Sequence, residues 1–224
     1  MLRALIFDFD GVILDTEVPA YRAWQTTYES FGASLPLEEW AKGIGSGRNE
    51  KSFDSYAFLE ESIGHPVDRE QVRLAYRSRS DALIALEGPR TGVAELILAA
   101  RDAGVRLAVA SSSPRGWIEG HLTRLGLLDY FAAIRCFDDV ARTKPHPDLF
   151  LSALDAVGMG GNEAIAFEDS PNGILAAKRA GLFCIAVANP VTALLDLSGA
   201  DLWFDSFTQI DLAMLRGAID GSAK

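Results

Sequence analysis

The sequence predicts an α/β fold: a doubly wound, Rossmann-like parallel sheet core with an inserted α-helical cap domain. Three observations lead to this class. A short apolar run at residues 5–7 has the composition of a strand buried on both faces. Residues 17–86 then follow a helical pattern almost throughout, and from Gly92 onward short apolar strands alternate with helices. Because alternating β and α units form a parallel sheet with helices on both faces, the first strand belongs with the later region.

The alternating region supplies the other elements of the expected sheet. Strands are expected at residues 105–111, 133–137, 164–169, 182–188 and 201–204. The intervening helices are expected to begin near Thr91, Pro114, His146 and Ser170. Within the helical block, glycine and proline predict loops at residues 32–36, 43–48 and 64–66.

Two linkers divide the chain. One lies near residues 14–16, and the other lies near residues 87–91, where EGPRTG carries the glycine and proline expected of a hinge. The sequence therefore predicts a core domain of residues 1–15 plus 90–224 and a cap domain of residues 16–89.

The composition is that of a folded, soluble protein. Apolar residues make up 49% of the 224 residues and charged residues 23%, and no apolar stretch approaches the roughly 18 residues that a membrane span requires. Asp8 and Asp10 interrupt the apolar start, which argues against a signal peptide and favours the cytoplasm. The net charge of −10 disfavours nucleic acid and anionic membranes as partners. No surplus apolar helix face is evident, so a monomer is expected.

Cysteine and tryptophan are expected to serve packing. Cys136 and Cys184 both lie in apolar, strand-like runs, which predicts buried free thiols in a reducing compartment. The tryptophans lack an accompanying basic stripe and are expected to pack in the core or the cap rather than stack on nucleic acid; they are Trp24, Trp40, Trp117 and Trp203.

The stretch FDFDG places two carboxylates on one side of the chain directly after the first strand. Side chains two apart in a strand share a face, so Asp8 and Asp10 would repel each other unless a cation or shared proton compensates. Ser111 and the pair Glu168–Asp169 also follow expected strands. In an open parallel sheet, ligands bind beyond the carboxyl ends of the strands. We therefore expect these residues to meet at one edge.

Together these motifs supply the parts of a phosphoryl-transfer site. Asp8 can act as a nucleophile that forms an acyl-phosphate, and Asp10 as general acid and then general base. Asp169, with Glu168, would complete an oxygen-rich site for Mg²⁺. The phosphate oxygens would be held by Ser111 and Ser112, by backbone N–H groups at the next helix start, and by the charge of Lys144.

Each motif taken alone has an ordinary structural explanation. A pair of aspartates can lie in a solvated turn, SSSP and EDSP can cap helices, and Lys144 can be a surface lysine. Their occurrence together, in this order and at strand ends, favours the catalytic interpretation.

At these residues the sequence resembles the haloacid dehalogenase superfamily. The motifs that carry the resemblance are FDFDGVILDTE, VASSSP, KPHPD and FEDSPNGILAAKRAG, and it extends over nearly the whole chain. It is closest to the branch with a small helical cap, which includes β-phosphoglucomutase and many sugar-phosphate phosphatases. The resemblance implies an Mg²⁺-dependent phosphatase of small phosphorylated metabolites, such as sugar or polyol phosphates, acting through an aspartyl-phosphate.

The resemblance also implies roles for individual residues. Asp8 would be the nucleophile and Asp10 the acid and base, while Ser111 and Lys144 would bind phosphate. The metal would take the Asp8 side chain, the Asp10 carbonyl and the Asp169 side chain, with Glu168 nearby. Family members that cleave carbon–halogen bonds lack the second aspartate, so Asp10 argues against dehalogenase activity.

Two alternatives stay open. A β-phosphoglucomutase-type phosphotransferase is one, although the cap histidine of such enzymes aligns with Ala20 and a cap lysine is missing near Ser78, where Arg77 and Arg79 lie close. A signalling receiver domain uses similar residues, but its acceptor aspartate lies on the third strand, whereas here the acidic pair opens the chain. The first alternative differs from hydrolysis only in the acceptor.

The segment AKGIGSGRNE, residues 41–50, is the expected substrate-facing loop of the cap. Its glycines permit close backbone approach, and Lys42 and Arg48 could meet a second anionic or hydroxylated group of the substrate. An ordinary solvated loop with two surface cations is the alternative. Asp15 or Thr16 is expected to cap the first cap helix.

Overall fold

The computed structural model describes residues 1–44 and 53–222 of the chain. Its centre is a parallel sheet whose strand order is β3-β2-β1-β4-β5-β6. The strands are β1 (Ala4–Phe7), β2 (Arg106–Ala110), β3 (Ala133–Arg135), β4 (Ala164–Glu168), β5 (Phe183–Val187) and β6 (Leu202–Phe204). The order reverses beside β1, which lies between β2 and β4, so the sheet is doubly wound and the predicted fold class is confirmed.

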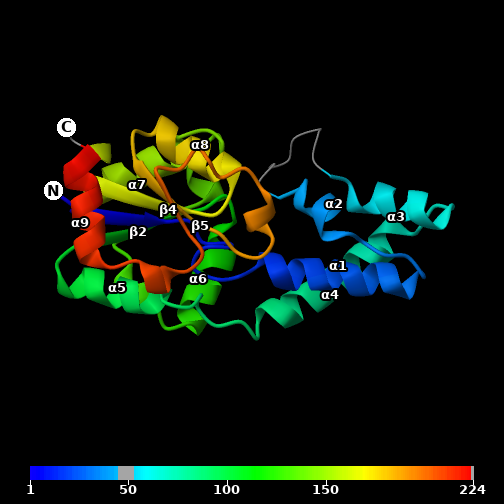
Figure 1. Cartoon of the computed structure of the whole chain (residues 1–224). Coiled ribbons are helices and arrows are strands. Elements are labelled where there is room, and N and C mark those ends of the chain that lie inside the picture. The colour runs from blue at the N-terminus through cyan, green and yellow to red at the C-terminus, as the bar shows by residue number, and fades with distance from the viewer. Residues whose placement is uncertain (45–52, 223–224) are drawn as a thin grey trace.

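Helices cover both faces of the sheet (Figure 1). The helices of this part are α5 (Val93–Asp102), α6 (Arg115–Arg124), α7 (Asp148–Val157), α8 (Pro171–Arg179) and α9 (Leu212–Ser222). The helices predicted near Thr91 and His146 begin two residues later than expected, because the preceding Gly92 and Pro147 occupy their N-cap positions.

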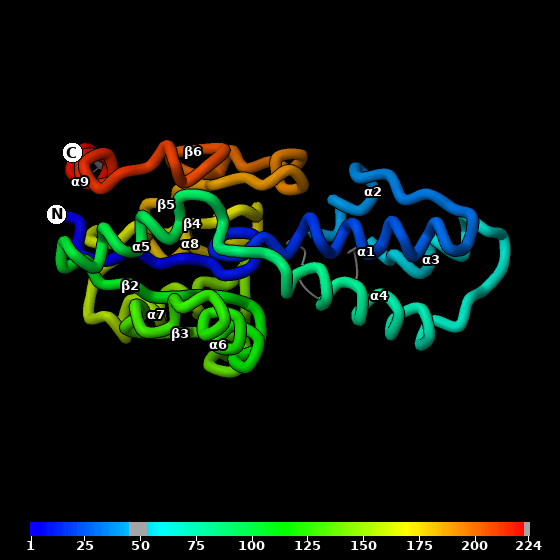
Figure 2. Tube along the Cα trace, turned by 90° about the horizontal axis from the view of Figure 1, so that it is seen from below, coloured from blue at the N-terminus to red at the C-terminus, as the bar shows by residue number. Residues whose placement is uncertain are grey.

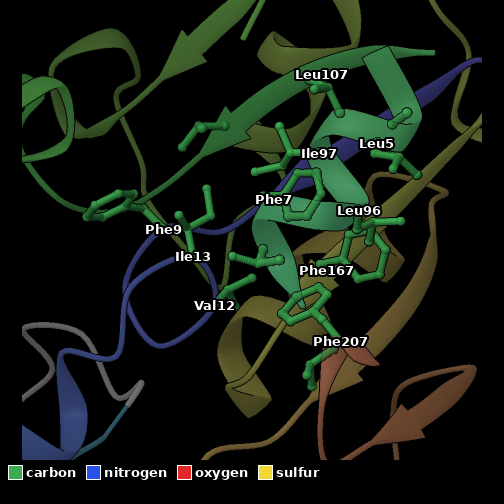
Figure 3. Close-up of a cluster of buried hydrophobic side chains, with 14 of the residues drawn as sticks. Leu5, Phe7, Phe9, Val12, Ile13, Leu96, Ile97, Leu107, Phe167 and Phe207 are labelled. Atoms are coloured by element: carbon green, nitrogen blue, oxygen red, sulfur yellow. The ribbon is translucent and has the colours of Figure 1, made fainter. Parts of the chain in front are cut away.

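The two faces of the sheet are packed differently because successive strand residues point to opposite sides. Phe7 lies in the cluster with α5 and α9, where its ring stacks on Phe167 with centroids 4.8 Å apart, and Phe167 meets Phe207 at 5.3 Å (Figure 3). Ile6 points to the other face, which the strands line mostly with alanine. Small side chains let α7 and α8 lie close to the sheet, so both faces are buried as the apolar strands predict.

The inserted helices form a separate bundle beyond the carboxyl edge of the sheet (Figures 1 and 2). They are α1 (Glu17–Ser30), α2 (Leu37–Ala41), α3 (Ser55–Ile63) and α4 (Arg69–Ile84). α1 and α4 lie side by side, and Trp24 stacks on Tyr76 with ring centroids 4.3 Å apart. The bundle has its own buried cluster around Trp24, Tyr28 and Leu59. The domain boundaries stay a prediction.

The first helix of the cap begins with an aspartate cap, as the sequence predicts. The Asp15 carboxylate accepts hydrogen bonds from the backbone N–H groups of Glu17 and Val18, both at 3.1 Å, and so caps α1. Asp54 and Asp68 cap α3 and α4 in the same way. Each cap satisfies N–H groups that have no partner inside the helix.

Several smaller expectations have clear outcomes. Cys136 and Cys184 are buried free thiols, as predicted. Trp24 and Trp40 are buried in the cap, but Trp203 is 49% exposed because β6 is an edge strand. No helix in the described part of the chain is long and apolar enough to cross a bilayer.

Candidate active site

The carboxyl ends of the three central strands bring the motif residues together. Asp8 follows β1, Ser111 follows β2, and Asp169 follows β4. The backbone N–H of Asp8 donates to the Phe167 carbonyl at 2.9 Å, which continues the strand ladder for one more residue and fixes where the Asp8 side chain leaves the sheet. The site therefore lies at the point where the strand order reverses, the usual ligand position in such sheets.

Lys144 supplies the positive charge of the site from the loop before α7. Its Nζ lies 2.8 Å from Asp8 Oδ1 and 2.6 Å from Glu168 Oε1, and all three side chains are buried. Burial alone would lower the pKa of Lys144, but the carboxylates of Asp8 and Glu168 outweigh it and raise that pKa above its usual value. Lys144 is therefore a fixed cation beside the nucleophile candidate.

Asp8 has one engaged and one open carboxylate oxygen. Its Oδ1 accepts from the backbone N–H of Phe9 at 2.7 Å and contacts Lys144, whereas Oδ2 has no hydrogen-bond partner within the described residues. Asp8 is also one of the residues that line a cavity.

Asp8, Glu168 and Asp169 form a buried acidic cluster suited to a divalent cation. One oxygen of each lies within 4.8 Å of the others. Burial, together with the charges of Glu168, Glu17 and Asp8, raises the pKa of Asp169 well above its usual range. Burial likewise raises the pKa of Glu168 to about 7, against the opposing effect of Lys144. A bound cation would relieve both effects, so the donor set fits a hard divalent metal.

Two glycines leave the space that the acidic side chains occupy. A Cβ on Gly11 would lie 1.9 Å from Asp169 Oδ2, and Gly11 has a φ of +74°, which L side chains rarely adopt. A Cβ on Gly173, at the start of α8, would lie 2.0 Å from the Glu168 carboxylate. The glycine of FDFDG is therefore required by its backbone and by Asp169, and the glycine of SPNG by the Glu168 carboxylate.

Asn189 orients Asp169. Its Nδ2 donates to Asp169 Oδ2 at 2.9 Å, while its Oδ1 accepts from the backbone N–H groups of Val191 and Thr192. Asn189 is buried, and these hydrogen bonds hold its amide at both ends. Because Asn189 binds only Oδ2 of Asp169, the other Asp169 oxygen is left for a ligand. Partners of this kind fix the direction of metal-binding carboxylates.

Asp10 accepts hydrogen bonds from two side chains. The Ser113 hydroxyl donates to Oδ2 at 2.5 Å and the Trp117 indole N–H donates to Oδ1 at 2.9 Å. Burial raises the pKa of Asp10, and the nearby Asp8 charge adds to this, while both hydrogen bonds oppose it. A carboxyl group with a raised pKa is suited to give up and take back a proton.

A cavity of about 770 Å³ lies between the sheet edge and the cap helices. Its floor carries Asp8, Asp10, Ser111, Ser112, Lys144 and Asp169. Its opposite wall is formed by cap residues, which include Glu17, Ala20, Trp40, Tyr76, Arg77 and Ser80. The volume suits a small molecule.

Comparison with known proteins now identifies the family. Residues 5–187 match the model of the haloacid dehalogenase-like hydrolases. The chain belongs to this family. It is 42% identical over 215 residues to YhcW of Bacillus subtilis strain 168, a candidate phosphatase, with 96% of each chain covered. It is 30% identical over 222 residues to the beta-phosphoglucomutase of the same organism, covering 96% of this chain and 94% of the relative.

A solved structure of this haloacid dehalogenase-like family agrees over nearly the full length. It is a variant of CbbY from Rhodobacter sphaeroides in complex with xylulose-1,5-bisphosphate, with a TM-score of 0.71 and 31% identity, covering 95% of this chain and 98% of that one. The relatives confirm the predicted family, its β-phosphoglucomutase-like branch and the enzyme class, a phosphoric monoester hydrolase. A divalent metal is general in the family, and the buried acidic cluster is where it would bind.

The positions of the predicted site residues differ between core and cap. The core residues all line the cavity, except Glu168, which lies beneath it in contact with Lys144. Lys42 does not line the cavity, because its ammonium group pairs with Glu39 at 2.6 Å on the exposed side of α2. Arg48 lies outside the described residues.

Several residues of this hydrolase site are not predicted by the sequence. The sequence pattern assigns Trp117 to packing, yet its indole donates to Asp10, and Ser113 has a role there beyond the helix start that SSSP indicates. Asn189 carries no local motif. Arg90 belongs to the expected hinge, but its guanidinium donates to the carbonyls of Gly11, Val187 and Ala188 and so ties the linker to two loops of the site.

Proposed function

We propose that this protein is an Mg²⁺-dependent phosphatase that hydrolyses small phosphorylated metabolites, of the sugar or polyol phosphate class, through an aspartyl-phosphate on Asp8. The observation that carries the proposal is the pairing of Asp8 with a buried Lys144 at 2.8 Å, beside the acidic cluster and within reach of a cavity of small-molecule size. The similarity to YhcW, a candidate phosphatase, supports the reaction, and the xylulose bisphosphate bound by the CbbY variant supports the substrate class.

The first half-reaction forms the covalent intermediate. A carboxylate oxygen of Asp8 bonds to phosphorus as the bond to the leaving oxygen breaks. Lys144 and the Ser111 and Ser112 side chains hold the phosphoryl oxygens, whose charge must be balanced for an anionic nucleophile to approach. Mg²⁺, held by the Asp8 and Asp169 side chains and the Asp10 carbonyl, would neutralise further charge on the same group.

Asp10 moves the proton in both half-reactions. Protonated Asp10 donates to the leaving oxygen, which departs as an alcohol. The Asp10 carboxylate then takes a proton from water as the water oxygen bonds to phosphorus, and the bond from phosphorus to Asp8 breaks. Inorganic phosphate is released and both aspartates return to their starting states. Ser113 and Trp117 hold Asp10 in position for these transfers.

The alanine at position 20 favours hydrolysis over phosphoryl transfer to a sugar. This position of α1 lines the cavity and presents a methyl group where the mutase resemblance would require an imidazole. Without that imidazole, the base that the mutase resemblance would require for a sugar hydroxyl is missing, which favours water as the acceptor. We also propose that the core, residues 1–15 plus 90–224, and the cap, residues 16–89, close on the substrate about their two linkers.

The test is phosphate release from a panel of sugar, polyol and organic-acid phosphates. The wild type is expected to release phosphate with Mg²⁺ and to stop when a chelator is added. Asp8→Asn should lose at least about 10³-fold in kcat, because it removes the nucleophile. Release that persists in Asp8→Asn would overturn the assignment, and release only after a bisphosphate primer is added would favour the mutase.

A further inference from the structure

Glu17 is an acidic side chain of the cavity for which the proposed mechanism has no use. It is the first residue of α1 and lines the cap wall opposite the aspartates. Its backbone N–H is bonded to Asp15, but across residues 1–44 and 53–222 its carboxyl group has neither a hydrogen bond nor an ion pair. A half-buried carboxyl group without a protein partner is costly unless something else in the cavity binds it.

Within the described part of the chain, the charges that act on Glu17 are those of three aspartates. Burial, with the charges of Asp10, Asp15 and Asp8, raises its pKa to about 8. Near neutral pH this group is therefore largely protonated and can both donate and accept a hydrogen bond. Among residues 1–44 and 53–222, no cation shifts this pKa, although Arg77 lines the same cavity.

The hydroxyl group of Thr16, next to Glu17, also lacks a hydrogen-bond partner among the described residues. Thr16 is 7% exposed and lines the cavity. Ser80 adds a further hydroxyl to the cap wall. This wall therefore offers hydrogen-bonding groups of both kinds directly above the catalytic aspartates.

The geometry points to Glu17 as a specificity-determining residue that hydrogen-bonds a hydroxyl group of the substrate's leaving group. This inference rests on the proposed phosphatase function. A hydroxyl is neutral and both donates and accepts, so it satisfies Glu17 in either protonation state. A carboxylate group of a substrate at the same place would be repelled by the negative charges of Asp8, Asp10 and Asp15. Polyol and sugar phosphates therefore fit this wall, and esters such as phosphoglycolate do not.

The test compares esters of equal chain length with and without hydroxyl groups. The pairs are glycerol 3-phosphate with n-propyl phosphate, and xylitol 5-phosphate with n-pentyl phosphate. For each pair, kcat/KM is measured with Mg²⁺ for the wild type, Glu17→Ala and Glu17→Gln. Glu61→Ala, at an exposed position of α3 outside the cavity, is the matched control.

The wild type is expected to prefer the hydroxylated ester of each pair. Glu17→Ala should lower kcat/KM for the hydroxylated ester about tenfold more than for its alkyl partner, the fold-change that loss of one buried hydrogen bond gives. Glu17→Gln keeps a donor and an acceptor and should retain most of the preference, and Glu61→Ala should retain all of it.

The outcomes separate this inference from the proposed function. If Glu17→Ala lowers kcat/KM for both esters of a pair by the same factor, or changes neither value, Glu17 does not bind the hydroxyl group. The inference is then wrong, while the proposed phosphatase function is unaffected. If the wild type releases no Asp8-dependent phosphate from any of the four esters, the proposed function fails first. A wild type that turns over both members of a pair equally also overturns the inference.

Discussion

Replacing Gly11 by alanine should damage the site far more than it damages the fold. Gly11 has a φ of +74° and the added Cβ would lie 1.9 Å from Asp169 Oδ2 and 3.2 Å from Asn189 Nδ2. Gly32 has the same φ of +74°, at the end of α1, and an alanine methyl group there would have nothing within 4 Å. The two substitutions therefore share the backbone strain and differ in the contact with Asp169.

The shared strain is small. An alanine in the left-handed region costs about 1–2 kcal/mol, and the reduced freedom of the unfolded chain offsets about 0.4–1 kcal/mol of it. At position 11 the Asp169 carboxylate must also retreat by about 1 Å to reach the 3.0 Å limit of real Cβ contacts. A displacement of that size at a reacting centre can lower the rate about 10²-fold.

The assay measures kcat/KM for phosphate release, the Mg²⁺ concentration that gives half-maximal rate, and the urea midpoint of unfolding. Gly32→Ala should lose about 1 kcal/mol of stability or less and keep its activity within about twofold. Gly11→Ala should lose about 10²-fold in kcat/KM and require more Mg²⁺. The reasoning is refuted if folded Gly11→Ala matches Gly32→Ala in both rate and Mg²⁺ requirement.

Three further predictions concern other residues that hold the site. Arg90→Met removes three hydrogen bonds to carbonyl groups and should lower the free energy of unfolding by on the order of 2 kcal/mol in urea, and a loss below about 0.5 kcal/mol would contradict this role. Asn189→Leu leaves Asp169 without its donor and should weaken apparent Mg²⁺ affinity about tenfold in a rate titration, whereas an unchanged titration would rule out the orienting contact. Because the folded-state pKa of Glu17, about 8, lies above its usual value, the folded state binds the extra proton and stability falls as pH rises toward 8, by at most about 1.4 kcal/mol per pH unit. Glu17→Gln should remove this slope in thermal melts with chelator between pH 5 and 8, and parallel slopes would count against the raised pKa.

Much of this molecule follows from local sequence. The apolar runs predict the strands because residues buried on both faces of a parallel sheet leave no polar alternation. Once the strands are parallel, Asp8, Ser111 and Asp169 must meet, since their strand ends lie on one edge. The first cap helix is also capped by Asp15, as predicted, because a cap depends only on neighbouring backbone N–H groups.

The residues that hold the site in place depend on contacts between distant parts of the chain. Trp117 reaches Asp10 only because α6 packs with that side toward the sheet edge, and a helical period cannot say which neighbour a side chain meets. The partner of Asn189 is set by the pairing of β5 with β4, and that of Arg90 by the approach of the linker to the loop after β1. Lys42, by contrast, does not line the cavity and pairs locally with Glu39, one helical turn away on the exposed face. Local patterns were thus enough to predict the fold and the motif residues that meet at the sheet edge, whereas packing between distant segments selects the side chains that orient them and the cap residues that line the cavity.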